Sequence, residues 1–453
     1  MNSARHIMNR SREWAHRSSH FARMLLPAVL CALVSAAPAP QEEPIRSSEE
    51  AGPAPRLRVP WEDRAIDFGV QPPNSIRVVS DVEREHLPRV LERIALLRSL
   101  GERMFGSAPL IRPDLPQLLL FESPEEMRFT LRTAFGVAAP SGPALAVSHS
   151  SGPVLAVTSR FSSPYGLERA LQAEAFHQYL IPRCSSELPP WARAGLAEYF
   201  GAIVSQGARW RSGHCPPDMV ETLQRAQGRN RLVPFDRLLQ LDQEGWTRFE
   251  SVNGPELMQA QAWSLVQFML HGGSDELTRR FGRWLERVCA GNEPIATFRR
   301  LMTELPGGST MAGIDEAWQA SLSALEPSAM ITARERAELL REGLDRLERQ
   351  GVRPEDPRAL CELISNGPLF EHVVRSHPYQ RALDSHDSDL LDPESMVFLP
   401  VSPRPVDRRR GRVPSPPRVR FVSGPEWTVE IVWDYVDDSK GWFPRVEIKP
   451  RQG

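Results

Sequence analysis

The chain has almost no excess charge of either sign. Its 453 residues include 55 basic and 57 acidic ones, for a formal net charge of −2. Proteins that bind nucleic acid or an anionic surface through their overall charge carry a clear positive excess, which is missing here. We therefore predict no nucleic-acid partner. Lysine is scarce too, since Lys440 and Lys449 are the only two, so the basic residues are almost all arginine.

Long apolar runs are also missing. No segment beyond the N-terminal region approaches the roughly 20 apolar residues that a membrane-spanning helix needs, so we predict no transmembrane span. The N-terminal region itself has several arginines, then an apolar run at residues 24–34 and small residues at 34–36. This order is typical of a cleaved signal peptide, which we place at residues 1–36. The expected location is the periplasm, the cell envelope or the extracellular space.

Cysteine is sparse, with five in the chain and no C-x-x-C spacing that would indicate a metal knuckle. Removal of the signal peptide would leave Cys184, Cys215, Cys289 and Cys361. An even number in an exported chain permits two disulfides with three possible connectivities. We expect Cys184 to pair with Cys215, because both flank the two helices discussed below.

Proline, in contrast, is abundant at 42 residues and marks irregular stretches. Residues 37–74 and 378–417 are both predicted to be linkers. The arginine run at 408–412 within the second fits a solvated linker better than a site for an anionic polymer. The remaining periodic sequence predicts a main domain at 75–325, a helical extension at 326–377 and a small antiparallel β meander at 418–453.

Three tryptophans lie in the predicted meander, at Trp427, Trp433 and Trp442. They would either form a binding face or pack against the rest of the protein. The alternation of apolar and polar residues around them predicts strands at 418–422, 427–435 and 442–448. The pattern by itself favours neither role for the tryptophans.

The main domain combines strands and helices in an order that predicts an α+β fold. Alternation predicts strands at 75–80, 115–121, 144–148 and 153–158, the last two joined by a turn. Helical spacing predicts a long helix at 82–105, a short helix after Ser123, and a mostly helical region at 217–325. The large aromatic residues of that region are expected in its core. His149, at the hairpin tip, is expected to be a solvated turn residue.

The most informative stretch lies at residues 167–200. It predicts one helix at 167–181, ended by Pro182, and a second that begins near Trp191 after a Pro–Pro break. In an H-E-x-x-H helix, two histidines one turn apart bind zinc and the Glu between them activates the bound water. The corresponding window here is AEAFH. It keeps Glu174 and His177 but lacks the first histidine.

Three segments, QAEAFHQYL at 172–180, LPPWARAGLAEYF at 188–200 and QAQAWSLV at 259–266, together resemble the gluzincin metallopeptidases, in particular the peptidase MA-like and aminopeptidase N-like group. In that family the second helix reads W-L-x-E-G-x-A, and its Glu is the third zinc ligand. By this resemblance Glu174 stands at the position of the catalytic base and His177 at the second ligand. Ala173 and Ala194 stand at the first and third ligand positions.

The resemblance covers residues 75–325. It implies a gluzincin-like, thermolysin-type domain with a small N-terminal sheet, an edge hairpin along the substrate cleft and a helical C-terminal lobe. It also implies that zinc is not retained, because a catalytic zinc site needs three protein ligands and a water. We therefore expect no cofactor, with zinc as the alternative.

A displaced metal site is the alternative to a lost one. Glu198 lies one helical turn after Ala194 on the same face, and His214 follows soon after. Together with His177 they would restore three ligands. Otherwise Glu198 is a carboxylate that lines the cleft, and His177 forms a hydrogen bond with it or with Glu174.

Three functions remain open from the sequence. The first is an exported pseudopeptidase that binds an unknown peptide or envelope protein. The second is an active zinc metallopeptidase with the displaced ligand set. The third is an envelope scaffold whose C-terminal strands are the working surface.

Overall fold

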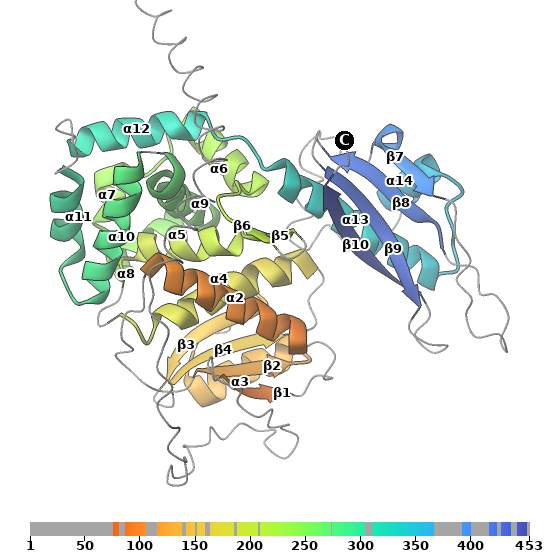
Figure 1. Ribbon diagram of the computed structural model, residues 1–453, viewed down its shortest axis with the longest axis horizontal. Coiled ribbons are helices and arrows are strands. Elements are labelled where there is room, and N and C mark those ends of the chain that lie inside the picture. The colour runs from red at the N-terminus through yellow and green to blue at the C-terminus, as the bar shows by residue number, and fades with distance from the viewer. Residues whose placement is uncertain are drawn as a thin grey trace, which may run out of the picture. The chain divides into compact units, whose positions relative to one another are not determined.

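A computed structural model shows a mixed α and β architecture, as expected from the order of the predicted elements (Figure 1). It describes residues 76–80, 87–105, 116–137, 142–149, 152–158, 164–184, 188–206, 209–272, 274–303, 310–366, 392–399, 416–423, 427–435 and 442–450. All of these belong to one compact unit, Leu57–Gly453. The predicted signal peptide at 1–36, the linker at 37–74 and the arginine run at 408–412 lie outside the described residues and stay predictions.

The N-terminal sheet has four strands in the order β1-β2-β4-β3. They are β1 (Arg77–Ser80), β2 (Gln117–Phe121), β3 (Ala144–His149) and β4 (Gly152–Thr158). β1, β2 and β4 run parallel, while β3 pairs antiparallel with β4 at the edge of the sheet. All four strands agree with the sequence prediction.

Helices cover both faces of this sheet. Successive side chains of a strand point to opposite faces, so β2 places Leu118 and Leu120 in the main core and Leu119 and Phe121 in a smaller one. α2 (Leu87–Phe105) contributes to the main core, and α3 (Pro124–Phe135) covers the other face. The α3 helix begins where predicted, because the Ser123 side chain accepts a hydrogen bond from the Glu126 backbone N–H at 3.1 Å.

A mostly helical region follows. Its elements are α4 (Pro164–Leu180), α5 (Pro190–Gly201), β5 (Val204–Gln206), β6 (Arg209–Arg211), α6 (Pro217–Gly228), α7 (Phe235–Leu239), α8 (Gln243–Asn253), α9 (Pro255–Gln267), the π-helix η2 (Phe268–Gly272), α10 (Asp275–Cys289), α11 (Pro294–Thr303) and α12 (Met311–Ser323). The aromatic residues expected in its core are buried, namely Trp246, Trp263, Phe268, Trp284 and Trp318. Among the described residues, no helix combines the length and the apolar character needed to cross a membrane.

α9 is largely buried in the helical region, and three of its polar side chains form hydrogen bonds with neighbouring segments. The Gln261 amide bonds both the N–H and the C=O of Val233, at 3.0 and 3.1 Å. Ser264 accepts a hydrogen bond from the Trp318 indole at 3.2 Å, and Gln267 donates to the Gly213 carbonyl at 3.1 Å. These bonds tie α9 to three other segments, so they offset the cost of burying polar groups in the core.

α5 approaches α9 so closely that one residue of α5 has no room for a side chain. A Cβ atom at Gly195 would lie 2.3 Å from the backbone oxygen of Ala262 and 2.7 Å from a methyl group of Val266. Carbonyl oxygen cannot move aside as a flexible side chain can. The glycine in the segment WARAGLAEYF is therefore required by helix packing.

The C-terminal region combines two helices with a second sheet. α13 (Ala329–Arg349) and α14 (Pro357–Asn366) share one apolar core with β7 (Met396–Leu399), β8 (Arg418–Ser423), β9 (Trp427–Tyr435) and β10 (Trp442–Pro450). The sheet order is β10-β9-β8-β7, and all its pairs are antiparallel. Three strands were predicted for this sheet, and it has four. The prediction missed β7, because β7 lies within the proline-rich stretch that was assigned to a linker.

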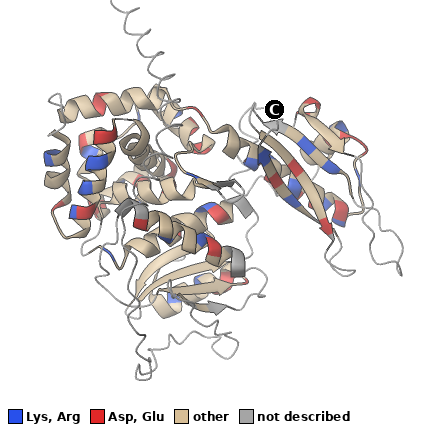
Figure 2. Cartoon of the chain, in the orientation of Figure 1, with Lys and Arg blue, Asp and Glu red and all other residues tan. Residues whose placement is uncertain are grey.

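Charged side chains are prominent on the strands of this second sheet (Figure 2). Glu430 of β9 is bound by Arg418 at 2.7 Å and by Arg420 at 2.5 Å, both from β8. On the other face, Trp433 is buried in the core shared with α13, and Trp442 packs against it. Trp427 is buried with Val204, Met330 and Ile331. Trp427 and Trp433 are therefore buried and Trp442 is partly buried, which favours the alternative in which the tryptophans pack against the rest of the protein.

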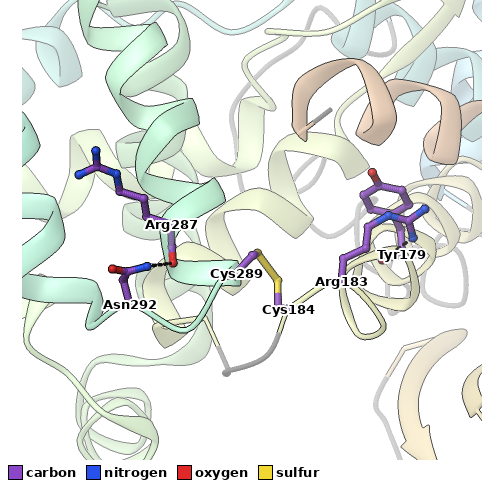
Figure 3. The surroundings of a disulfide bond; sticks show 6 residues. All are labelled: Tyr179, Arg183, Cys184, Arg287, Cys289 and Asn292. Atoms are coloured by element: carbon purple, nitrogen blue, oxygen red, sulfur yellow. Dashed lines mark hydrogen bonds between the residues drawn. A yellow bond between two sulfur atoms is a disulfide. The ribbon is translucent and has the colours of Figure 1, made fainter. Parts of the chain in front are cut away.

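The disulfide differs from the expected one. Cys184, just after α4, is bonded to Cys289, the last residue of α10 (Figure 3). Cys215 and Cys361 are free thiols. The predicted pairing of Cys184 with Cys215 was wrong because closeness in the sequence was used in place of closeness in space. Arg183 directly precedes Cys184, and its guanidinium lies 3.8 Å from the centroid of the Tyr179 ring (Figure 3).

Removal of this disulfide should destabilise the protein. Its cysteines are 105 residues apart, and a cross-link over a loop of that length restricts the unfolded chain. We expect replacement of both Cys184 and Cys289 by Ser to lower the free energy of unfolding by about 2–5 kcal/mol, measured by chemical denaturation. Cys215→Ser is the control and should cost less. A peptide linking Cys184 to Cys215 in mass spectra without reductant would contradict the assignment.

Substitution of Gly195 should show how tightly α5 and α9 pack. Gly195→Ala is expected to lower the free energy of unfolding by about 1–3 kcal/mol, because the added methyl group overlaps the Ala262 backbone. Gly282→Ala, in α10, is the matched control. Nothing lies near its Cβ position, so alanine there should stabilise the helix by about 0.5–1 kcal/mol. Equal effects of the two substitutions would argue against the close contact.

Candidate functional site

The two helices that carry the motif residues pack against each other in opposite directions. Phe176 of α4 stacks on Phe200 of α5 with ring centroids 3.8 Å apart. Near the start of α4, Arg169 binds Glu198 of α5 at 3.0 Å. Near the end of α4, His177 meets Arg193 at the start of α5. The motif residues are therefore brought together at the C-terminal end of α4.

His177 is held at both ring nitrogens. Its Nδ1 lies 3.3 Å from Glu174 Oε2, and its Nε2 lies 3.1 Å from the Arg193 carbonyl oxygen. Burial lowers the pKa of His177, but the charge and hydrogen bond of Glu174 and the Arg193 carbonyl raise it by more. The net pKa therefore lies above the usual 6.5. The His177 imidazole therefore links α4 to α5 through hydrogen bonds.

Glu174 has a partner that the sequence did not indicate. Its Oε2 accepts a hydrogen bond from the backbone N–H of Ala146, in the edge strand β3, at 2.8 Å. The side chain is one fifth exposed. A single carboxylate oxygen thus joins β3 to the motif helix and also contacts His177. Of the two bonding partners considered for His177, the structure has Glu174 and not Glu198.

The two alanines supply no ligand atom. Ala173 lies one turn before His177 and faces Gly201, where an added Cβ would be 3.5 Å from the Ala173 methyl group. Ala194 follows Arg193 directly and packs partly buried against the main core. A zinc ion at these positions would have His177 as its one imidazole ligand, with Glu174 already engaged. These residues do not fit a catalytic zinc site, which needs three protein ligands.

The displaced ligand set is not assembled either. Glu198 binds Arg169, which also binds Asp218 of α6 at 3.0 Å. His214 Nδ1 lies 2.8 Å from Ser328 Oγ, at the start of α13. In the described part of the chain, no three His, Cys, Asp or Glu residues are grouped so that they could hold a metal ion. The alternative site of His177, Glu198 and His214 has no support in these contacts, because Glu198 and His214 pair with other residues.

Charged residues near the start of α4 were missed by sequence reasoning. Glu168 binds Arg93 of α2 at 2.7 Å and Arg334 of α13 at 2.5 Å. The side chains of this group are at most 18% exposed, so the charges are largely shielded from water. The adjacent opposite charges of Glu168 and Arg169, on a helix whose other turns carry several apolar residues, were the signal available in the sequence. Together they connect α4 to α2, α5, α6 and α13.

A second pair of polar side chains was also missed. The Tyr199 hydroxyl lies 2.9 Å from His271 Nε2, and the two rings stack. Burial raises the pKa of Tyr199 to about 12 and lowers the pKa of His271. Both groups are therefore neutral near pH 7. His271 lies in the π-helix η2, which no periodicity in the sequence indicated.

Comparison with known proteins adds no family assignment. No protein-family model matches the chain, and no curated protein matches its sequence.

Removal of the Glu174 charge should lower the pKa of His177. In Glu174→Gln the carboxylate that raises this pKa is gone while burial still lowers it. The raised pKa means that the pair stabilises the folded state fully below pH 6.5 and loses this effect as pH rises through the folded-state pKa. The stability difference between wild type and Glu174→Gln should therefore shrink from pH 6 towards pH 9.

NMR titration of the histidine rings measures this directly. The signals of His214 and His271 serve as internal controls, since burial lowers the pKa of both and neither is coupled to Glu174. A His177 titration unchanged by the substitution would contradict the pairing.

Proposed function

We propose that the chain is an exported, gluzincin-like pseudopeptidase that binds a peptide or envelope protein without zinc catalysis. The observation that carries the proposal is the placement of His177 at the first turn of α5, with its Nε2 3.1 Å from the Arg193 carbonyl oxygen. A gluzincin relationship requires this proximity of the two helices. The resemblance assigns the other two ligand positions to Ala173 and Ala194, which supports a site that lacks its metal-binding groups.

The order of the elements supports the same relationship. A small sheet that ends in the β3–β4 hairpin is followed by α4, α5 and a helical region that contains α9. The resemblance implies this order. The segment QAQAWSLV lies in α9, in direct contact with α5 through Ala262 and Gly195. Three segments that carry the resemblance are therefore neighbours in space.

The scaffold alternative has less support. It would use the C-terminal strands as the working surface, and their tryptophans were its candidate binding residues. Trp427 and Trp433 are each 6% exposed and serve the packing of the protein. Loss of these residues would therefore unfold the region before it revealed a partner.

Restoration of both missing ligands tests the proposal. Ala173→His combined with Ala194→Glu should raise bound zinc from well below one equivalent to about one per chain, because the resemblance assigns these positions to the first and third ligands beside His177. The measurement is elemental analysis after purification without chelator, with circular dichroism to verify folding.

The matched control is Ala173→His with Ala194→Gln, which has the same shape but a poorer zinc ligand. It should retain much less zinc than the Glu variant. A folded double variant without bound zinc would count against the gluzincin relationship. One equivalent of zinc in the wild-type protein would count against a silent site.

A further inference from the structure

The β3 edge of the N-terminal sheet determines which backbone groups another chain could reach. β3 pairs with β4, and the hydrogen bond from Thr158 N–H to the Pro143 carbonyl sets which residues face β4. Backbone groups alternate in direction along an antiparallel pair. Leu145 and Val147 therefore bond to β4, while Ala144, Ala146 and Ser148 direct their N–H and C=O groups away from the sheet.

Such outward groups are the usual template for an added strand. An extended peptide gains affinity by pairing with successive free N–H and C=O groups of an edge strand. On β3, the outward N–H group of Ala146, which lies between those of Ala144 and Ser148, already has an acceptor. The Ala146 N–H donates to Glu174 Oε2 at 2.8 Å, the position that a carbonyl oxygen of an added strand would otherwise occupy.

The carboxylate is held firmly in this position. His177 contacts the same oxygen at 3.3 Å and is itself held by the Arg193 carbonyl. A bond to an ionised acceptor is roughly twice as strong as one between neutral groups. An incoming peptide would have to replace it with a neutral carbonyl and leave Glu174 with one donor fewer.

We propose that Glu174 caps the edge of β3 and closes it to strand addition, so that the partner of this protein is recognised without pairing its backbone to β3. The residue at the position of the catalytic base is then an intramolecular competitor for the peptide backbone. The inference rests on the proposed function, because that function supplies the peptide or protein partner. The capping contact itself, however, involves only residues of β3 and α4.

Amide hydrogen exchange in the full-length protein tests the cap. In Glu174→Ala the Ala146 amide should exchange about 10- to 100-fold faster, because it loses its acceptor to water. Leu145 and Val147, bonded to β4, should exchange as in the wild type. Glu174→Gln keeps an acceptor oxygen and should restore most of the protection. An Ala146 amide that exchanges equally in wild type and Glu174→Ala would overturn the cap.

Strand addition at the outward edge is tested with a synthetic extended peptide that has the β4 sequence GPVLAVT, which in the protein pairs with the opposite edge of β3. Excess peptide should shift the Ala146 and Ser148 amide signals in Glu174→Ala and leave them unchanged in the wild type. Shifts in the wild type would show an open edge, and no shift in Glu174→Ala would show that Glu174 does not close it. Either result overturns the inference. Zinc binding by the restored-ligand variant is independent of both, so the two proposals can fail separately.

Discussion

The contact of α5 with α9 is the constraint on which the site depends. At Gly195 the two helices approach until a methyl group no longer fits. On its other side α5 packs on α4 through the stacked rings of Phe176 and Phe200. α5 is therefore held between two helices, and this packing places its first turn beside His177. The short distance from His177 to the Arg193 carbonyl follows from this packing.

The charges of α4 reinforce its position. Glu168 and Arg169 point to different neighbours, so that α2 and α13 are bound by one residue and α5 and α6 by the other. Loss of one member of such a shielded group leaves its partner without compensation, which costs more than the pair contributes. α4 is therefore held in place by several independent ion pairs.

Much of the fold followed from local patterns. Apolar periodicity predicted α4, α5 and α9, and alternation predicted β1 to β4, because each pattern reports which face of one element is buried. The disulfide partner of Cys184, the strand β7 and the bond from Ala146 to Glu174 did not follow. Each depends on residues far apart in the sequence. In β7 the proline-rich surroundings also concealed a short strand. The contact of His177 with Glu174 was one of two that the sequence offered, but the bond of Glu174 to Ala146 and that of His177 to the Arg193 carbonyl were not predicted.

The shared core of the C-terminal region has a consequence for how this region folds. α13 and α14 contribute one side of this core and β7 to β10 the other, although the two sets lie on either side of residues 367–391. Neither side can bury its apolar surface without the other. The helices and the sheet therefore form one cooperative unit, and a chain that lacked either half would expose the apolar surface of the other to water.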